Sequence, residues 1–111
     1  MKRVKWDIEE MVAMVDLYYN CKNGCISDLN AELERLSKKL HRRADILKIQ
    51  HDEKFRNLNG LKMIYENVRY VDTNGMRGLS CASQLAYDIV RLYNENNSDF
   101  RKILDGFNLK Y

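Results

Sequence analysis

The sequence has 111 residues, enough for one domain with its own hydrophobic core and too few for two independent domains. Its residues are 45% hydrophobic and 32% charged, as in a globular protein, and no apolar run reaches the roughly eighteen residues that a membrane-spanning helix needs. The net charge of +3 is too small for a strongly basic nucleic-acid-binding protein, and three cysteines are an odd count that favours reduced thiols in a cytoplasmic protein over a disulfide framework.

Helices are the elements that the composition favours, because the chain has no proline and only five glycines to form the many turns of a β protein. The first predicted helix spans residues 6–20, where apolar residues recur at helical spacing and Asp7 is placed to act as the N-cap. A second helix is expected to begin after Ser27 or Asp28 and to present one leucine stripe. It should end near Arg43 unless the segment ADILKIQ prolongs it.

Three more helices are predicted in the second half of the chain. The third lies within residues 54–75, where five apolar residues point inward and two glycines follow the helix. The fourth is expected after an N-cap at Ser80, and the fifth after Ser98 or Asp99. We therefore predict an all-α fold in a single domain of residues 1–111. It should be a compact bundle of about five short helices, each packing through one apolar stripe, with a helix-turn-helix-like core.

Positive charge gathers in the middle of the chain, because residues 31–70 carry ten basic and six acidic side chains. The second predicted helix contains five basic residues without an acidic residue between them: Arg35, Lys38, Lys39, Arg42 and Arg43. Spacings of three and four place most of them on one side of the helix, away from the leucine stripe. This side is either a solvated face, partly neutralised by Glu32 and Glu34, or a surface that contacts nucleic-acid phosphates.

The third predicted helix carries polar residues near its start: Arg56, Asn57, Asn59 and Lys62. Arginine and asparagine can each make two hydrogen bonds to a base edge in the major groove of DNA, which admits an α-helix. Asparagine is also a favoured N-cap residue, so Asn57 and Asn59 could instead cap their own helix. The residue types are consistent with both interpretations.

No residue pattern predicts a metal site, a cofactor site or a catalytic centre. Cys21 and Cys25 form one loosely spaced pair, whereas a zinc site usually shows two tight pairs, so we expect free thiols and no metal. His41 lies in the basic run and His51 beside Asp52 in a polar segment, without the oriented partner that a general base needs. We therefore expect no enzymatic activity and no cofactor.

Several segments together carry a family likeness. They are WDIEE at residues 6–10, LSKKL at 36–40, FRNLNGLKM at 55–63 leading into ENVRYVD at 66–72, GLSCASQLAYDIVRLY at 78–93 and FRKIL at 100–104. Over residues 6–104 the chain resembles the N-terminal helical module of bacterial HNH-type restriction endonucleases. The resemblance implies an accessory role, in which the module helps a nuclease or other effector to find or hold DNA.

By the same resemblance, Arg56, Asn57, Gly60 and Asn67 match motif positions of that family. The start of the chain is also similar to Myb-type three-helix DNA-binding proteins, whose third helix reads the groove. The sequence contains no His-Asn-His nuclease motif, so the resemblance carries over no cutting activity.

Two functions follow from the residues and the resemblance. The first is a non-catalytic module that binds duplex DNA through the two polar clusters, in a bacterial or phage restriction-modification or defence system. A nuclease or other defence protein would be its partner, and we expect no membrane partner. The second is a protein-interaction module, such as an inhibitor, an immunity protein or an adaptor of such a system. It would bind through Trp6, Tyr18 and Tyr19, because aromatic residues dominate binding hot spots.

Overall fold

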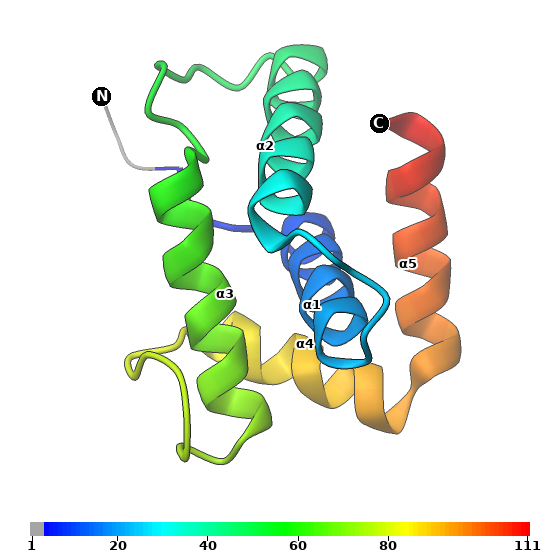
Figure 1. Ribbon diagram of the computed structural model, residues 1–111. Coiled ribbons are helices and arrows are strands. Elements are labelled where there is room, and N and C mark those ends of the chain that lie inside the picture. The colour runs from blue at the N-terminus through cyan, green and yellow to red at the C-terminus, as the bar shows by residue number, and fades with distance from the viewer. Residues whose placement is uncertain (1–3) are drawn as a thin grey trace.

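The structure is a computed structural model that describes residues 4–111. These residues form five helices and no strand, which confirms the predicted all-α class (Figure 1). The helices are α1 (Ile8–Lys22), α2 (Leu29–Ile46), α3 (Leu58–Asp72), α4 (Gln84–Glu95) and α5 (Asn97–Lys110). None of these five is long and apolar enough to cross a membrane.

The first three helices begin at N-cap residues that the sequence marks. The Asp7 carboxylate accepts the main-chain N–H of Glu10 at 3.0 Å, and the Glu10 carboxylate accepts that of Asp7 at 3.2 Å. This reciprocal capping box satisfies two helix-terminal donors of α1. Asp28 and Asn57 cap α2 and α3, each accepting one main-chain N–H of the first turn.

α4 begins later than predicted, because its N-cap is Ser83 and not Ser80. The segment before it packs on α3 instead of starting a helix. The Asn67 side chain donates to the main-chain oxygens of Leu79 at 2.8 Å and Ser80 at 3.2 Å. Gly78 lies so close to α3 that a Cβ atom there would be 2.3 Å from a main-chain oxygen of that helix. The backbone around Ser80 is therefore bound to α3.

Two other boundaries also differ from the predictions. α2 continues beyond Arg43 to Ile46, through the segment that the sequence allowed as an extension. It stops before Lys48, whose φ of 57° is left-handed and incompatible with a right-handed helix. α5 starts earlier than predicted because Asn96, which also ends α4, accepts a main-chain N–H of its first turn.

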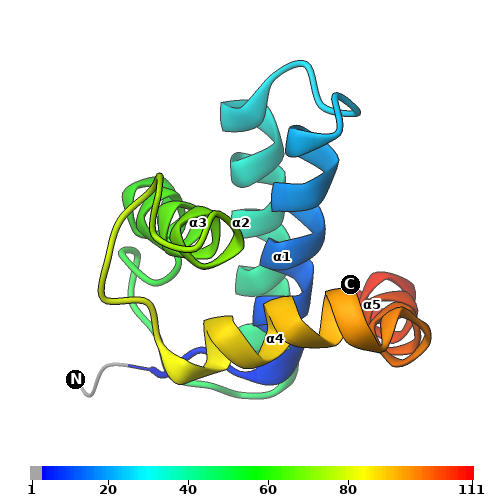
Figure 2. The same ribbon diagram turned by 90° about the horizontal axis from the view of Figure 1, so that it is seen from below.

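α1 lies at the centre of the bundle and packs against each of the other four helices (Figure 2). Residues 10–15 and 17–19 of this helix are all buried. The prediction of a single apolar stripe is wrong for α1, because a helix with neighbours on all sides must bury all of its faces.

The other helices are arranged around α1. α2 runs antiparallel to α1, and α3 packs against both (Figures 1 and 2). The connection between α2 and α3, residues 47–57, is longer than the turn of about three or four residues in the helix-turn-helix motif. α4 crosses α1 and packs also against α3 and α5, whereas the backbones of α2 and α5 lie apart and these two helices touch through side chains such as Lys39 and Asn108.

Candidate nucleic-acid interface

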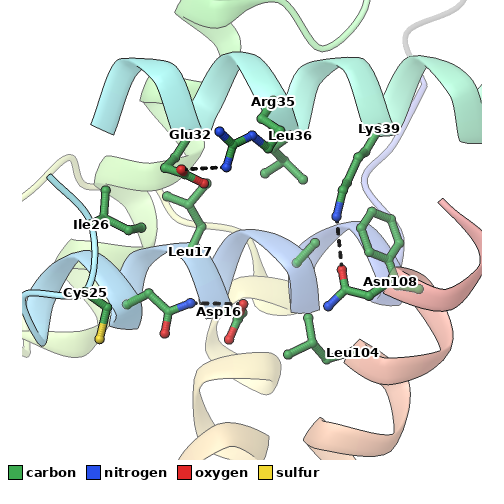
Figure 3. Close-up of a pocket in the computed structure, with 13 residues that line it drawn as sticks. Asp16, Leu17, Cys25, Ile26, Glu32, Arg35, Leu36, Lys39, Leu104 and Asn108 are labelled. Carbon is green, nitrogen blue, oxygen red and sulfur yellow. Dashed lines mark hydrogen bonds and ion pairs between the residues drawn. The ribbon is translucent and has the colours of Figure 1, made fainter. Parts of the chain in front are cut away.

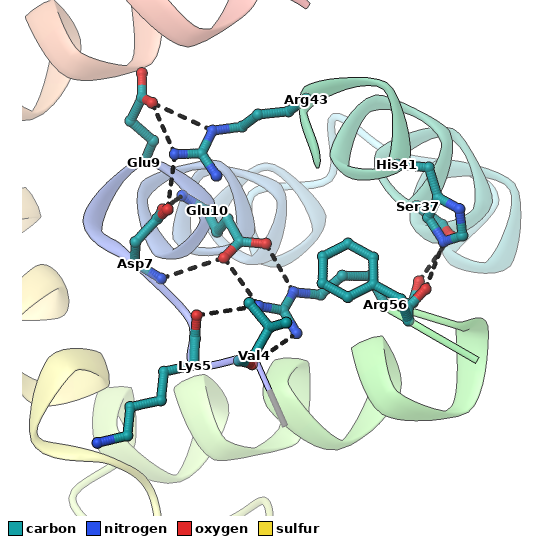
Figure 4. A network of polar contacts seen from close by, with 10 residues as sticks. Val4, Lys5, Asp7, Glu9, Glu10, Ser37, His41, Arg43 and Arg56 are labelled. Atoms are coloured by element: carbon teal, nitrogen blue, oxygen red, sulfur yellow. Dashed lines mark hydrogen bonds and ion pairs between the residues drawn. The ribbon is translucent and has the colours of Figure 1, made fainter. Parts of the chain in front are cut away.

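Arg56 is held by three parts of the chain that are distant in sequence (Figure 4). Its Nε donates to Glu10 Oε2 at 2.7 Å and its Nη2 to Glu10 Oε1 at 3.0 Å. Its Nη atoms also donate to the main-chain oxygens of Val4 and Lys5, each at 3.2 Å. From α2, the Ser37 hydroxyl donates to the Arg56 main-chain oxygen at 2.7 Å. These bonds fix the entry to α3 against α1, α2 and the N-terminal segment.

Aromatic rings cover the Arg56 guanidinium as well. Its Cζ lies 4.7 Å from the ring centroid of Trp6 and 4.4 Å from that of Phe55, within cation–π distance of both. The side chains of Arg56 and Glu10 are 8% and 3% exposed. Because Arg56 is committed to these internal contacts, its predicted contact with DNA is corrected to a structural role.

Asn57 and Gly60 make a second internal contact at this entry. The Asn57 side chain accepts the main-chain N–H of Gly60 at 2.8 Å, so it caps α3 and is not a free base-reading group. A Cβ atom at position 60 would lie 3.1 Å from Asn57 Oδ1, so glycine at this position avoids a close contact with the capping side chain. With Asn67 bound to the segment before α4, all four positions that match the family motif make contacts within the chain.

A groove of about 1010 Å³ opens between the start of α3, the loop before it and the N-terminal segment. Its lining includes Asn59, a predicted site residue, and Lys5 and Lys54, which were not predicted. All three residues are exposed, as is Lys62 one turn further along α3. Periodicity does not reveal Lys5 and Lys54, because both lie outside helices. The contacts of Arg56 bring the N-terminal segment, which contains Lys5, beside the loop that contains Lys54.

The positive charge of this region has no ion-pair partner in the described part of the chain. No carboxylate oxygen there lies within 4.0 Å of the ammonium group of Lys5, Lys54 or Lys62. The first turn of α3 also lacks an acidic residue, unlike those of α1, α2 and α5. The positive end of the α3 dipole is therefore uncompensated, which favours an anion at this place.

Two further titratable residues line the groove. The hydrogen bond of 2.8 Å between His51 Nε2 and Asp45 Oδ1 raises the pKa of His51 above its usual value. The Asp52 carboxylate accepts the main-chain N–H of Lys54 at 2.9 Å. The lining therefore carries one carboxylate, already hydrogen-bonded, against two exposed lysines.

Two cations of α2 line a furrow of about 260 Å³ between α2 and α5, with α1 as its floor (Figure 3). Arg35 Nη1 forms an ion pair with Glu32 at 2.8 Å, and Lys39 Nζ donates to Asn108 Oδ1 at 3.3 Å. Arg35 and Lys39, both predicted to contact phosphates, are thus bonded to partners within the chain.

The other three cations of the α2 run differ in exposure. Lys38 and Arg42 are exposed, and Arg42 donates to the main-chain oxygen of the last residue at 2.7 Å. Arg43 is buried, and its Nη2 lies 2.7 Å from Asp7 Oδ2 and 3.0 Å from Glu9 Oε1 (Figure 4). Burial opposes the charged form, but the two carboxylates outweigh it and raise the pKa of Arg43. Its predicted phosphate contact is corrected to an internal ion pair that joins α2 to α1.

Tyr18 and Tyr19 are only 4% and 6% exposed, so they are not the surface anchors that the sequence suggested. Their hydroxyls donate to Asp72 at 2.7 and 2.8 Å, and Lys22 Nζ lies 2.8 Å from the same carboxylate. Burial acts to raise the pKa of Asp72, but these hydrogen bonds outweigh it and hold the pKa below its usual value. Burial raises the pKa of both tyrosines. Of the three aromatic residues predicted for a protein interface, only Trp6 is half-exposed.

Cysteine and histidine side chains do not assemble into a site. Cys21, Cys25 and Cys81 are free thiols. Within residues 4–111, no three side chains of Cys, His, Asp or Glu are grouped to hold a metal ion.

No protein-family model, curated protein or solved structure matches the chain. The likeness to the endonuclease module therefore rests on the residue pattern alone.

Proposed function

We propose that the chain is a non-catalytic module that binds duplex DNA at the start of α3. The binding surface, here called the α3 entry surface, consists of Lys5, Lys54, Asn59 and Lys62. The observation that carries the proposal is the group of three exposed lysines without carboxylate partners around the uncompensated N-terminus of α3. DNA phosphates favour such a group, because each lysine that contacts a phosphate releases a condensed counterion.

Asn59 gives this surface a group that can contact bases. It is exposed in the first turn of α3, and its amide offers both a donor and an acceptor, the combination that adenine presents in the major groove. The N-terminal residues of a docked recognition helix are the ones that reach base edges. The exposed cations Lys38 and Arg42 of α2 form a second, smaller group that can add phosphate contacts.

The resemblance supports a wider role for the module. We propose that it acts in the cytoplasm beside a nuclease or another effector of a restriction or defence system and holds that effector on DNA. The protein-interaction alternative has less support, because Tyr18 and Tyr19 are buried and Trp6 alone of its three anchors is accessible.

Salt-dependent binding tests the proposal. Fluorescence anisotropy of a labelled duplex, measured between roughly 50 and 200 mM salt, should show affinity that falls steeply as salt rises. The double variant Lys54→Ala/Lys62→Ala should bind more weakly and reduce the log–log slope by about 1.8, since each phosphate contact contributes about 0.9.

A matched control is the double variant Lys102→Ala/Lys110→Ala, which removes the same charge from α5, a helix that does not pack against α3. It should leave affinity and slope close to those of the wild-type protein. An equal loss in both double variants would mean that only net charge matters. Failure of the wild-type protein to bind duplex DNA at low salt would refute the proposal.

A further inference from the structure

The groove at the α3 entry surface combines a cationic rim with an apolar floor. Trp6, Phe55, Met63 and Ile64 line it together with Lys5 and Lys54. Met63 is 56% exposed, and Trp6 and Ile64 are half-exposed. A fully paired duplex presents phosphates and base edges but hides the faces of its bases in the stack. Phosphate contacts alone therefore leave the apolar floor of the groove without a partner.

We propose that this groove binds an unpaired nucleobase of the nucleic acid, with the base on Trp6 and Met63 and the flanking phosphates at Lys5 and Lys54. The inference rests on the proposed function and names the feature of DNA that the same surface recognises. Grooves that bind single-stranded nucleic acid combine cations along the backbone with aromatic rings under the bases. The volume of about 1010 Å³ lies at the upper end of the usual range for ligand pockets, about 300–1,000 Å³.

Trp6 is suited to this role because its position is already fixed. The Arg56 guanidinium covers the ring at 4.7 Å, and Arg56 is itself bound to Glu10 and to the main-chain oxygen of Lys5. A ring held in this way loses little conformational freedom when a base stacks on it. Arg56 is thus a positioning residue that holds Trp6 in the floor of the groove.

Charge around the floor favours a nucleic acid over an uncharged apolar ligand. The two lysines of the lining have no carboxylate partner in the described chain, whereas Asp52 already accepts a main-chain N–H. Asn59, exposed on the same lining, offers a donor and an acceptor to a base edge. An acidic peptide with apolar side chains also matches a cationic rim and an apolar floor, and competition between the peptide and a single strand separates the two.

Intrinsic fluorescence provides a direct test, because Trp6 is the only tryptophan of the chain. Three probes of equal length would be titrated: a thymine-only single strand, a fully paired duplex, and that duplex with one unpaired nucleotide. The single strand and the duplex with the unpaired nucleotide should quench Trp6 emission. The unpaired nucleotide should tighten binding by about 5- to 150-fold over the paired duplex, the gain expected from one base–aromatic stack.

Substitutions in the floor provide the second arm. Met63→Ala and Trp6→Leu should each reduce the preference for the unpaired nucleotide, measured as the ratio of the affinities for the two labelled duplexes. Leu109→Ala is the matched control, since Leu109 is 90% exposed on α5. Thermal unfolding of every variant verifies that it is folded, and Met63→Ala keeps the Trp6 signal.

The outcomes are distinct. Equal affinity for both duplexes with unchanged Trp6 emission would overturn the base-binding inference and leave the proposed function standing. No binding of any of the three probes would overturn both. Quenching by an acidic peptide that binds more tightly than the single strand and displaces it would also overturn the inference.

Discussion

Replacing Arg56 with alanine is the sharpest test of how the entry to α3 is built. Arg56 lies 46 residues from Glu10 in sequence, and their side chains are 8% and 3% exposed. Removing the guanidinium leaves the Glu10 carboxylate buried without its cation. Breaking a buried pair by removing one partner costs about 3–5 kcal/mol. We therefore expect Arg56→Ala to lower the free energy of unfolding by about that amount, a large part of the roughly 5–15 kcal/mol of a typical domain.

Alanine variants of two other arginines provide a comparison for the loss of unfolding free energy expected of Arg56→Ala. Arg43 is buried, but its partners Asp7 and Glu9 have side chains that are 45% and 26% exposed, so water can solvate them when the guanidinium is removed. Arg43→Ala should cost about 1–2 kcal/mol. Arg35 is 67% exposed and makes only a surface pair, so Arg35→Ala should cost less than about 1 kcal/mol.

Urea unfolding followed by circular dichroism gives the three free energies, and Trp6 emission reports locally on Arg56. A double-mutant cycle with Glu10→Gln isolates the pair itself, and a coupling energy above about 1 kcal/mol is expected for groups in direct contact. The reasoning would be refuted if Arg56→Ala were no more destabilising than Arg35→Ala, or if the cycle showed no coupling.

Three further predictions concern helix ends, glycines and pH. Asn57→Ala should cost about 0.5–2 kcal/mol in urea unfolding because it removes the cap of α3, whereas Asn59→Ala should change stability by less than about 0.5 kcal/mol and weaken DNA binding by anisotropy. Gly78→Ala should lower the melting temperature, since φ is +91° and the new Cβ would meet the α3 backbone, whereas Gly106→Ala, in open space within a helix, should stabilise by about 0.5–1 kcal/mol. The folded-state pKa of Asp72 is held below its usual 3.8, so its contribution to stability is present above that pH and lost as the pH falls through the folded-state pKa. Asp72→Asn should therefore lower the urea midpoint at pH 7, and a midpoint difference that does not shrink below pH 3.8 would contradict this.

The sequence predicts the helices of this protein better than it predicts the residues of the candidate site. Residue type predicted Asn59 and Lys62 as site residues, and both are exposed at the start of α3, but it equally predicted Arg43 and Arg56, whose side chains are buried. Arginine is the same residue in a phosphate contact and in an internal ion pair, and only the position of a carboxylate distinguishes the two. Periodicity does not predict Lys5 and Lys54, because lysines outside helices belong to no periodic pattern.

The helices and several of their ends follow from local patterns in the sequence. Asp7, Asp28 and Asn57 cap their helices through hydrogen bonds to residues three positions away, and the apolar stripe of α2 follows the helical repeat. Such interactions join residues that are close in the sequence, so they can be predicted without knowledge of the fold.

Which polar groups remain available to a partner depends on how the helices pack. In the folded protein α1 is the central helix, and the segment before α4 is bound to α3. The Arg56–Glu10 pair brings lysines of two separate segments to one groove. Each of these outcomes depends on groups that are far apart in the chain and meet only after the helices pack. The spacing of residues along one helix does not predict such contacts. When the helices pack, some charged side chains become buried and others stay exposed at the surface.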